Sequence, residues 1–213
     1  NAQVDTAQSK FGGASALFDG SGDYISIPDS DDWAFGTANF TIDLQFRANS
    51  LAASGALFGY RLDGSNNFFL RVNTDGSLMF ALQVGGVVTI TASSAAAAIT
   101  TGTWCHLALV RNGNAFNLYK DGTSIATATD VDSFPNVAIG WELGRDGGTN
   151  LSTNGWIDEF RISNVARWGT TFTPPTSAYT TGFNNAVVRS AQIPLITSPT
   201  MVRAAILVSE IDA

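Results

Sequence analysis

The chain has 213 residues, a formal net charge of −7 and a sequence pI near 4.4. It shows no cluster of lysine and arginine, so we expect neither nucleic acid nor an anionic membrane surface as a partner. No apolar run approaches the roughly 20 residues of a membrane-spanning helix, so no membrane insertion is expected. Hydrophobic residues make up 45% of the chain and charged residues 14%, with 21 glycines, which is typical of an ordered, turn-rich protein. The single cysteine, Cys105, excludes an intrachain disulfide and is expected to lie in the core.

Short strands separated by turn signals are predicted along the first half of the chain. The first two, 14–18 and 24–27, flank an Asp-Gly-Ser-Gly-Asp turn. A single helical turn is expected after Pro28, where Ser and Asp side chains can cap it. The alternation of apolar and polar residues over 40–47 predicts a strand with one face in the core. Further strands, separated by glycine-containing turns, are expected at 56–62, 67–73, 77–84 and 87–92.

The stretch 102–122 predicts a β-hairpin. Its two apolar runs, 104–110 and 115–119, flank Arg-Asn-Gly-Asn, and the second run ends at Asp-Gly. Both dipeptides accept the positive φ angles of tight hairpin turns. The first run is apolar at nearly every position, so both of its faces are expected to be buried. Strands at 124–129, 137–143 and 155–162 complete a pattern that favours a β-sandwich or barrel over alternating strands and helices.

The strand pattern stops after residue 162. Consecutive prolines at 174–175 break helices and sheet ladders, so 170–179 is expected to be extended, as a wrapping tail or a linker. Apolar runs resume after residue 185. The sequence therefore predicts a β-domain over 1–179, followed over 180–213 by a linker and the start of a second β segment. Because the chain begins at Asn1 and ends in an apolar run, we expect it to be a fragment of a longer protein.

Five motifs in order carry a resemblance to a known family. They are FDGSGDYISIP at 18–28, FTIDL at 40–44, WCHLALVR at 104–111, LYKDG at 118–122 and GWIDEFRIS at 155–163. Together they resemble the laminin-G-like, concanavalin-A-like jelly-roll family over residues 11–179. The resemblance implies an all-β fold, a two-sheet antiparallel jelly-roll sandwich. The segments 166–168 and 172–175 are similar to versions in bacteriophage tail and virion-appendage proteins and in secreted bacterial proteins.

The carboxylates do not predict a catalytic site. Glycanases of this fold need two carboxylates on one face of the sheet, one as the acid and the other as the nucleophile or base. Asp158 and Glu159 are adjacent in a predicted strand, so their side chains are expected to point to opposite faces. His106 is the single histidine, and no nucleophile-elbow serine motif is present. We expect a non-enzymatic domain in which His106 packs and hydrogen-bonds across the sandwich.

A structural calcium ion is implied by the resemblance, because jelly rolls of this kind often hold Ca²⁺ near a sheet edge. Hard cations prefer carboxylate and carbonyl oxygens supplied by turns, which makes Asp19, Asp23 and Asp158 the candidate ligands. The alternative is that Asp19 and Asp23 only shape their turn and that Asp158 caps a strand.

A carbohydrate site would combine exposed aromatic rings, which stack on sugar rings, with amides and charged groups that fix the sugar's orientation. For each aromatic candidate the alternative is a place in the core. The candidate ligand-binding residues are Tyr60, Asn66, Trp141, Arg145, Asp146, Asn150 and Trp168.

The function that the sequence favours is a non-enzymatic binding or structural domain of a virion appendage, a tail or fibre protein that contacts glycans on a host surface. Its expected partners are those glycans and other subunits of a virion or extracellular assembly, including further copies of this chain. We keep two alternatives: an architectural or decoration subunit, and a carbohydrate-binding module of a secreted bacterial adhesin or hydrolase. The predicted location is the virion surface or the extracellular space.

Overall fold

The computed structural model describes residues 2–149, 151–179 and 207–210, which form β-strands and a single 3-10 turn, η1 (Asp31–Trp33), but no α-helix. None of these residues lies in a helix long and apolar enough to cross a membrane. The strands are β1 (Gln3–Asp5), β2 (Ser15–Asp19), β3 (Ile25–Ile27), β4 (Phe40–Ala48), β5 (Gly55–Arg61), β6 (Asn67–Val72), β7 (Leu78–Val84), β8 (Val87–Ser93), β9 (Trp104–Asn112), β10 (Ala115–Lys120), β11 (Thr123–Thr129), β12 (Trp141–Leu143), β13 (Asn154–Ser163) and β14 (Leu207–Glu210).

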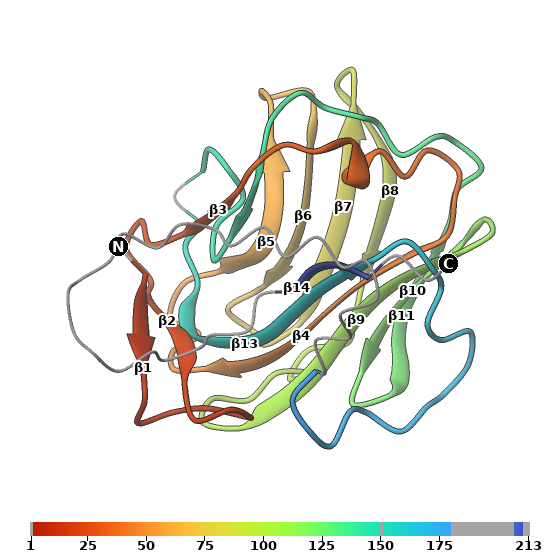
Figure 1. Ribbon diagram of the computed structural model, residues 1–213. Helices are drawn as coiled ribbons and strands as arrows, with labels where there is room; N and C mark the ends of the chain where they lie inside the picture. Colours follow the sequence, from red (N-terminus) through yellow and green to blue (C-terminus); the bar gives the residue numbers. More distant parts are fainter. Residues whose placement is uncertain (1, 150, 180–206, 211–213) are drawn as a thin grey trace.

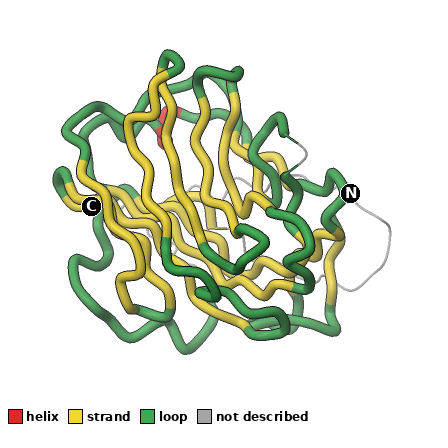
Figure 2. Tube along the Cα trace, turned by 180° about the vertical axis from the view of Figure 1, so that it is seen from behind, coloured by secondary structure: helices red, strands yellow, loops and turns green. Residues whose placement is uncertain are grey.

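Two sheets pack face to face, as Figures 1 and 2 show from opposite sides. The eight-stranded sheet has the order β1-β2-β13-β4-β9-β10-β11, with β14 added beside β13. The six-stranded sheet has the order β3-β12-β5-β6-β7-β8. Every pairing is antiparallel except that between β13 and β14. The predicted two-sheet antiparallel jelly roll is confirmed.

The hairpin predicted at 102–122 is present as β9 and β10, which turn at Gly113 with a φ of 61°. The strand predicted at 137–143 is shorter than expected, since only Trp141–Leu143 forms β12. Gly140, just before β12, lies so close to the carbonyl oxygen of Ile27 that any side chain there would collide with it. The backbone of Gly140 therefore contacts β3 closely, and residues 137–140, the start of the predicted strand, do not form strand.

The core lies between the two sheets. On the eight-stranded sheet, β4 contributes most to the core. Its apolar residues alternate with polar ones, and those in the core include Phe40, Ile42, Leu44 and Phe46. Rings of the other sheet meet them, among them Phe68 and Trp141, whose centroids are 5.5 Å apart. Burial of each such side chain contributes roughly 1.5–3 kcal/mol to stability. The polar residues of β4 consequently face away from the core.

A segment that we call the strap, residues 164–179, crosses the outer face of the eight-stranded sheet. Trp168 and Phe172 pack there with Tyr119 of β10. The backbone N–H of Phe172 donates to the carbonyl of Gly122 at 3.1 Å, and no larger residue would leave room for this approach. The stretch 170–179, predicted to be a wrapping tail or a linker, thus wraps over the sheet.

Little of the predicted second β segment, 180–213, can be compared with the structure. Its described part is β14, which pairs in parallel with β13 of the jelly roll. The rest of that prediction lies outside the described residues.

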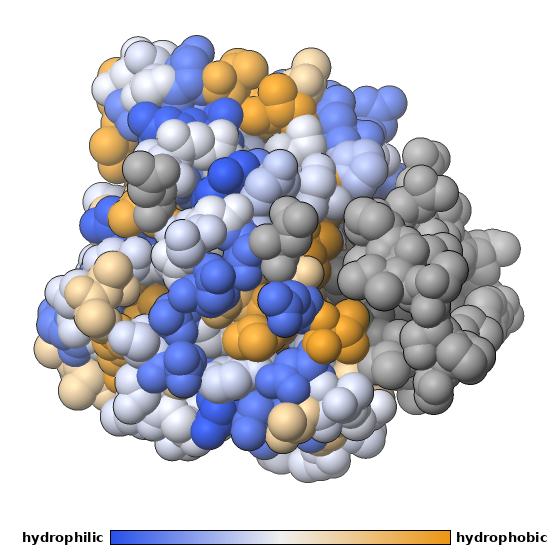
Figure 3. Space-filling view, turned by 90° about the vertical axis from the view of Figure 1, so that its left-hand side faces the viewer, coloured by the Kyte–Doolittle hydropathy of each residue, from blue (hydrophilic) through white to orange (hydrophobic). Residues whose placement is uncertain are grey.

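Figure 3 shows the side of the molecule that carries the N-terminal strands. Hydrophilic residues prevail on the coloured part of this surface, and apolar residues form small separate groups. The coloured part of this side shows no broad apolar surface of the kind that marks a large protein interface.

Candidate functional site

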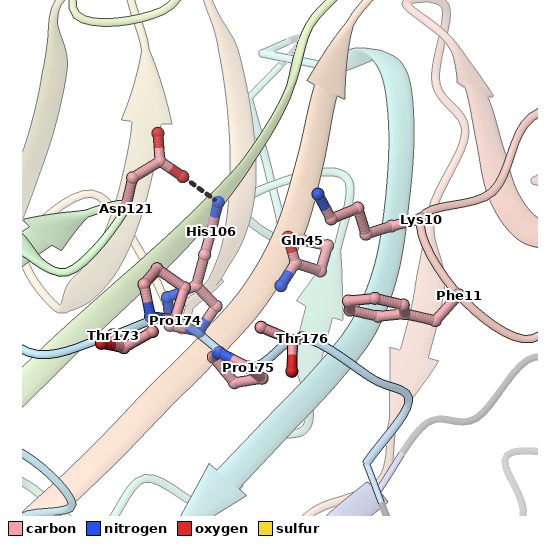
Figure 4. A pocket seen from close by; sticks show the side chains of 9 residues that line it. All are labelled: Lys10, Phe11, Gln45, His106, Asp121, Thr173, Pro174, Pro175 and Thr176. Atoms are coloured by element: carbon pink, nitrogen blue, oxygen red, sulfur yellow. Dashed lines mark hydrogen bonds between the residues drawn. The ribbon is translucent and has the colours of Figure 1, made fainter.

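A pocket of about 410 Å³ lies over the outer face of the eight-stranded sheet (Figure 4). Gln45 of β4 and His106 of β9 form its floor. The short segment with Lys10 and Phe11 approaches from one side, and residues 173–176 of the strap approach from the other. Asp121, in the turn after β10, completes the lining. A volume of this size is within the range of small-molecule sites, roughly 300–1,000 Å³.

The floor follows from strand alternation and register. Gln45 stands between two core residues of β4, so its side chain points to the opposite, outer face. His106 is its direct partner on β9, and directly opposed residues of antiparallel strands share a face. The walls on both sides then enclose these two side chains, each of which is only 1% exposed.

Three polar atoms of the floor are buried without a hydrogen-bond partner among the described residues. They are Nε2 and Oε1 of Gln45 and Nδ1 of His106. A buried polar group without a partner costs roughly 1–3 kcal/mol, and most such groups in folded proteins are paired. Both ends of one amide are unpaired here, next to an unpaired ring nitrogen. This arrangement can supply hydrogen bonds to a molecule in the pocket.

The hydrogen bond to Asp43 determines which nitrogen of His106 carries the proton. Nε2 of His106 lies 3.2 Å from Oδ2 of Asp43, and a carboxylate can only accept, so Nε2 donates. In the neutral imidazole, Nδ1 is then a hydrogen-bond acceptor. On its backbone, His106 donates its N–H to Oδ1 of Asp121 at 2.9 Å, which fixes the edge of the pocket (Figure 4).

Asp43 is the centre of a buried network under the strap. Arg161 donates to both carboxylate oxygens of Asp43 at 3.0 and 2.8 Å. The hydroxyl of Tyr179 and Nε2 of His106 both donate to Oδ2 of the same carboxylate. Burial by itself would raise the pKa of Asp43, but the hydrogen bonds from His106 and Arg161 outweigh it and hold that pKa below its ordinary value. The network therefore keeps a carboxylate ionised beneath the site and orients the imidazole.

The expectation that the side chains of Asp158 and Glu159 point to opposite faces is wrong, because β13 contains a β-bulge. The pairing with β4 shifts between Asp158 and Arg161, and Glu159 has a φ of 53°. Both carboxylates consequently lie on the outer face. Oδ2 of Asp158 accepts the N–H groups of Lys10 and Phe11 at 2.8 and 3.0 Å.

Glu159 holds the other wall in the same way. Its Oε2 accepts the N–H of Tyr179, the last described residue of the strap, at 2.6 Å. Burial raises the pKa of Asp158 and of Glu159. Neither carboxylate lines the pocket, and both are engaged by backbone amides. Their visible role is to position the two walls.

The three predicted calcium ligands do not come together. Oδ2 of Asp23 accepts the N–H of Asp19 at 3.1 Å, and Oδ1 of Asp19 accepts the N–H of Ser21, so both carboxylates shape their turn. Asp158 lies about 13 Å further along β13 than the partner of Asp19, at about 3.3 Å per residue. No group of three or more acidic, histidine or cysteine side chains suited to a metal is found among the described residues. Calcium binding by the Asp19–Asp23 turn stays a prediction, and Asp158 is removed from that set.

Two of the predicted ligand-binding aromatics are core residues. Tyr60 is 1% exposed and Trp141 is 2% exposed, and their rings pack against each other with centroids 5.8 Å apart. Neither ring reaches the surface, so neither Tyr60 nor Trp141 can stack on a sugar as the sequence predicted. Trp168 lies beside the pocket instead, stacked on Phe172 at 4.0 Å and in edge contact with the ring of His106 at 5.4 Å. It supports the strap and does not line the pocket.

The polar candidates lie on the other sheet. Oδ1 of Asn66 accepts the N–H of Gly85, which ties the turn after β5 to the turn after β7. Arg145 makes two hydrogen bonds to Glu142, at 2.7 and 2.8 Å. Asp146 is buried and accepts from Thr149. Asn150 lies outside the described residues.

The residues that line the pocket were missed as ligand contacts by sequence reasoning. The alternation of β4 placed Gln45 on the outer face, but nothing in the sequence distinguishes it from the other polar residues of that strand. The decisive information is tertiary, because the strap and the segment around Phe11 bury Gln45. The proline pair at 174–175 was the one local signal of a wrapping segment.

The comparisons with known proteins agree with this fold. A family model described as the concanavalin A-like lectin/glucanases superfamily matches residues 19–170. Domain 4 of AbnA, a GH43 extracellular arabinanase from Geobacillus stearothermophilus, was solved in complex with arabinotriose. It has a TM-score of 0.57 and 20% identity, over 76% of this chain and 74% of that one.

Two further solved structures are similar over most of the chain. A candidate carbohydrate-binding protein from Bacteroides ovatus has a TM-score of 0.57 and 21% identity, over 72% of this chain. Mouse laminin alpha1 domains LG4-5 have a TM-score of 0.54 and 20% identity, over 82% of this chain. The chain spans 44% and 47% of these two structures, respectively. No curated protein matches it. At these identities the likeness establishes the jelly-roll fold.

Proposed function

The chain belongs to the concanavalin A-like lectin/glucanases superfamily, and we propose that it is a non-catalytic carbohydrate-binding domain that uses the pocket over the eight-stranded sheet. One observation carries this proposal. Within the described part of the chain, the pocket floor holds a buried amide with both ends unpaired and a ring nitrogen without a partner. Sugars present many hydroxyl groups, each of which both donates and accepts, so a sugar can pair all three atoms.

The walls supply the apolar contact that a sugar ring also needs. Phe11 faces the pocket from one side, and Pro174 and Pro175 face it from the other. The hydroxyl-bearing Thr173 and Thr176 lie next to the prolines. Phe11 and the two prolines thus place apolar contact area beside polar groups, a combination that small-molecule sites use.

Engagement of the carboxylates supports binding without catalysis. Glycoside hydrolysis needs one carboxyl group free to act as an acid and a second free to act as a nucleophile or base. Asp158 and Glu159 share a face, but each holds a backbone segment. Asp43 is fully buried and bonded to three side chains.

We place the domain outside the cell, as one part of a larger protein that presents the pocket to glycans. The similarity to a domain of an extracellular arabinanase and to a candidate carbohydrate-binding protein supports this context, which was one alternative from the sequence. The virion appendage and assembly with further copies of the chain stay predictions from the sequence resemblance.

Nuclear magnetic resonance titration of the ¹⁵N-labelled chain tests the proposal. Adding methyl glycosides of galactose, mannose, glucose and arabinofuranose is expected to shift the Gln45 side-chain amide and the backbone amides of His106 and Thr176. Tyr60→Phe serves as the control, since a core ring should not affect binding. If no glycoside shifts these signals, and a bacterial glycan array is also silent, the domain does not bind sugars and the architectural alternative replaces the proposal.

A further inference from the structure

The pocket floor carries a specific pattern of donors and acceptors, and we infer that it recognises two hydroxyl groups on adjacent ring carbons of a neutral sugar. This inference rests on the proposed carbohydrate function and adds the chemical group that is read. One hydroxyl accepts from Nε2 of Gln45, and its neighbour donates to Oε1 of the same amide. A further hydroxyl donates to Nδ1 of His106.

The pattern follows from the contacts that surround the floor. Gln45 offers one donor group and one acceptor on the same planar amide, and both are unpaired and buried. In its neutral form His106 offers an acceptor at Nδ1, because its Nε2–H is directed to Asp43. A ligand that satisfies the floor must therefore donate to two atoms and accept from a third.

Adjacent hydroxyls in a gauche arrangement match the geometry of one amide. Their oxygens are separated by nearly the spacing of the amide nitrogen and oxygen, so both hydrogen bonds can form in the normal range of roughly 2.7–3.2 Å. Each hydroxyl can take either direction, so the pair adapts to a donor beside an acceptor. The C–H groups of the same ring are then free to contact Phe11 and the prolines of the strap.

Charged ligands fit this floor poorly. A carboxylate could accept from Nε2 of Gln45 and lie near the ammonium group of Lys10, but it would also face two acceptors, Oε1 and Nδ1, to which it cannot donate. An ammonium group could donate to both acceptors but would leave Nε2 without a partner. A buried group left unpaired costs roughly 1–3 kcal/mol, which disfavours both.

Binding measurements on modified sugars test the inference. Whichever methyl glycoside of the panel binds most tightly is compared, by calorimetric or resonance titration, with its derivatives that carry a single O-methyl group at each ring hydroxyl in turn. Methylation at two adjacent positions is expected to weaken binding about tenfold each, the effect of roughly one lost hydrogen bond. Methylation at a ring hydroxyl that makes no contact with the floor should change the affinity little.

Two variants assign the effect to the floor. Gln45→Met keeps the side-chain length but removes both hydrogen bonds, so it should weaken binding of the parent glycoside about tenfold to a hundredfold. In this variant, the two derivatives methylated at the adjacent hydroxyls should bind with the same affinity as the parent glycoside. His106→Gln keeps a donor toward Asp43 and replaces the ring nitrogen Nδ1 by an amide oxygen at a different position, so it should weaken binding while the two adjacent methylations still matter. Gln3→Met, an exposed amide on β1, is the matched control and should bind as the wild type does.

The outcomes separate this inference from the proposed function. If Gln45→Met weakens binding but no pair of adjacent methylations does, the adjacent-hydroxyl inference is overturned and carbohydrate binding in the pocket stands. If sugars bind and Gln45→Met has no effect, the pocket is not their site and both are overturned. If no methyl glycoside binds at all, the proposed function fails and the inference with it.

Discussion

At the scale of single residues, we expect the side chain of Gln45 to lower the stability of the free protein. Its amide is 1% exposed, and neither end has a partner among the described residues. A thioether or hydrocarbon of the same length would fill this position without a desolvated polar group. Residues that weaken the fold where a ligand would sit are typical of binding sites, because the ligand restores the missing bonds.

We predict that Gln45→Met raises the free energy of unfolding by about 1 kcal/mol, since it removes a buried group without breaking a hydrogen bond. Urea unfolding checks this. Gln83→Met on β7 is the contrasting variant, because Oε1 of Gln83 accepts from Asn67 at 3.0 Å, and it should destabilise by a similar amount. If both variants lower the free energy of unfolding equally, Gln45 has a hydrogen-bond partner in the folded protein and the prediction is wrong.

Cys105 gives a second prediction at this scale. Burial raises the pKa of its thiol to about 12, and the side chain is 4% exposed. The thiolate that reacts with disulfide reagents is therefore nearly absent in the folded protein at neutral pH. We expect an aromatic disulfide reagent at about pH 8 to modify Cys105 only after unfolding. Rapid modification of the folded protein would contradict the burial of this strand.

Among the elements, the strap has the greatest influence on the site. It is fixed at its middle by the stacked rings of Trp168 and Phe172 and at its end by Tyr179. The pocket-lining residues 173–176 lie between these two fixed points. Loosening either point should therefore open the pocket without disturbing the core between the sheets.

Tyr179→Phe removes the hydroxyl that bonds to Asp43 but keeps the ring that lies over Arg161, 3.8 Å from its guanidinium. We expect amide exchange of Phe172 and residue 179 to accelerate about tenfold, as the loss of one hydrogen bond in a local opening allows. Amides of β4 should exchange at the wild-type rate, which is the internal control. Uniform acceleration across β4 and the strap would contradict a separate opening of the strap.

The elements also show what the sequence could predict. The hairpin of β9 and β10 was predicted because its Asn-Gly and Asp-Gly turns and apolar runs are local signals. The bulge at Glu159 was missed because a glutamate at positive φ has no sequence signature. The core positions of Tyr60 and Trp141, and the coverage of Gln45, depend on segments distant in sequence, so residue type alone could not assign them.

For the whole molecule, the two sheets differ in how their outer faces are covered. The strap covers part of the eight-stranded sheet, whereas in Figure 2 the central strands of the six-stranded sheet lie in front with no other segment across them. The covered face holds three buried acidic groups whose pKa is shifted, Asp43, Asp158 and Glu159. The pH dependence of the whole fold should therefore include a contribution from this face.

We predict that Glu159→Gln gains stability relative to the wild type as the pH rises from about 4 to 7. Burial raises the pKa of Glu159, so its contribution is fully present below the ordinary glutamate pKa and is lost as the pH rises through the higher folded-state value. The glutamine keeps an oxygen for the N–H of Tyr179 but does not ionise. The gain should be on the order of 1 kcal/mol per unit of pKa difference.

Urea unfolding of both proteins across this pH range measures the difference, and parallel stability curves would contradict the prediction. Asp43 changes stability in the opposite sense. Its lowered pKa means that its contribution is present above the ordinary aspartate pKa and is lost as the pH falls through the folded-state value. That loss should occur equally in both proteins below about pH 4, where it serves as a control.

The bulge in β13 has a consequence for how this domain can diversify. Asp158 and Glu159 hold the two pocket walls by backbone N–H groups, which almost every residue type possesses. The side chains of the walls can therefore be exchanged while the anchors stay the same. Under the proposed function, mutation around positions 10–11 and 173–176 would alter the sugar preference without rebuilding the scaffold, which would make the pocket a suitable place to select new glycan specificities in a randomised library.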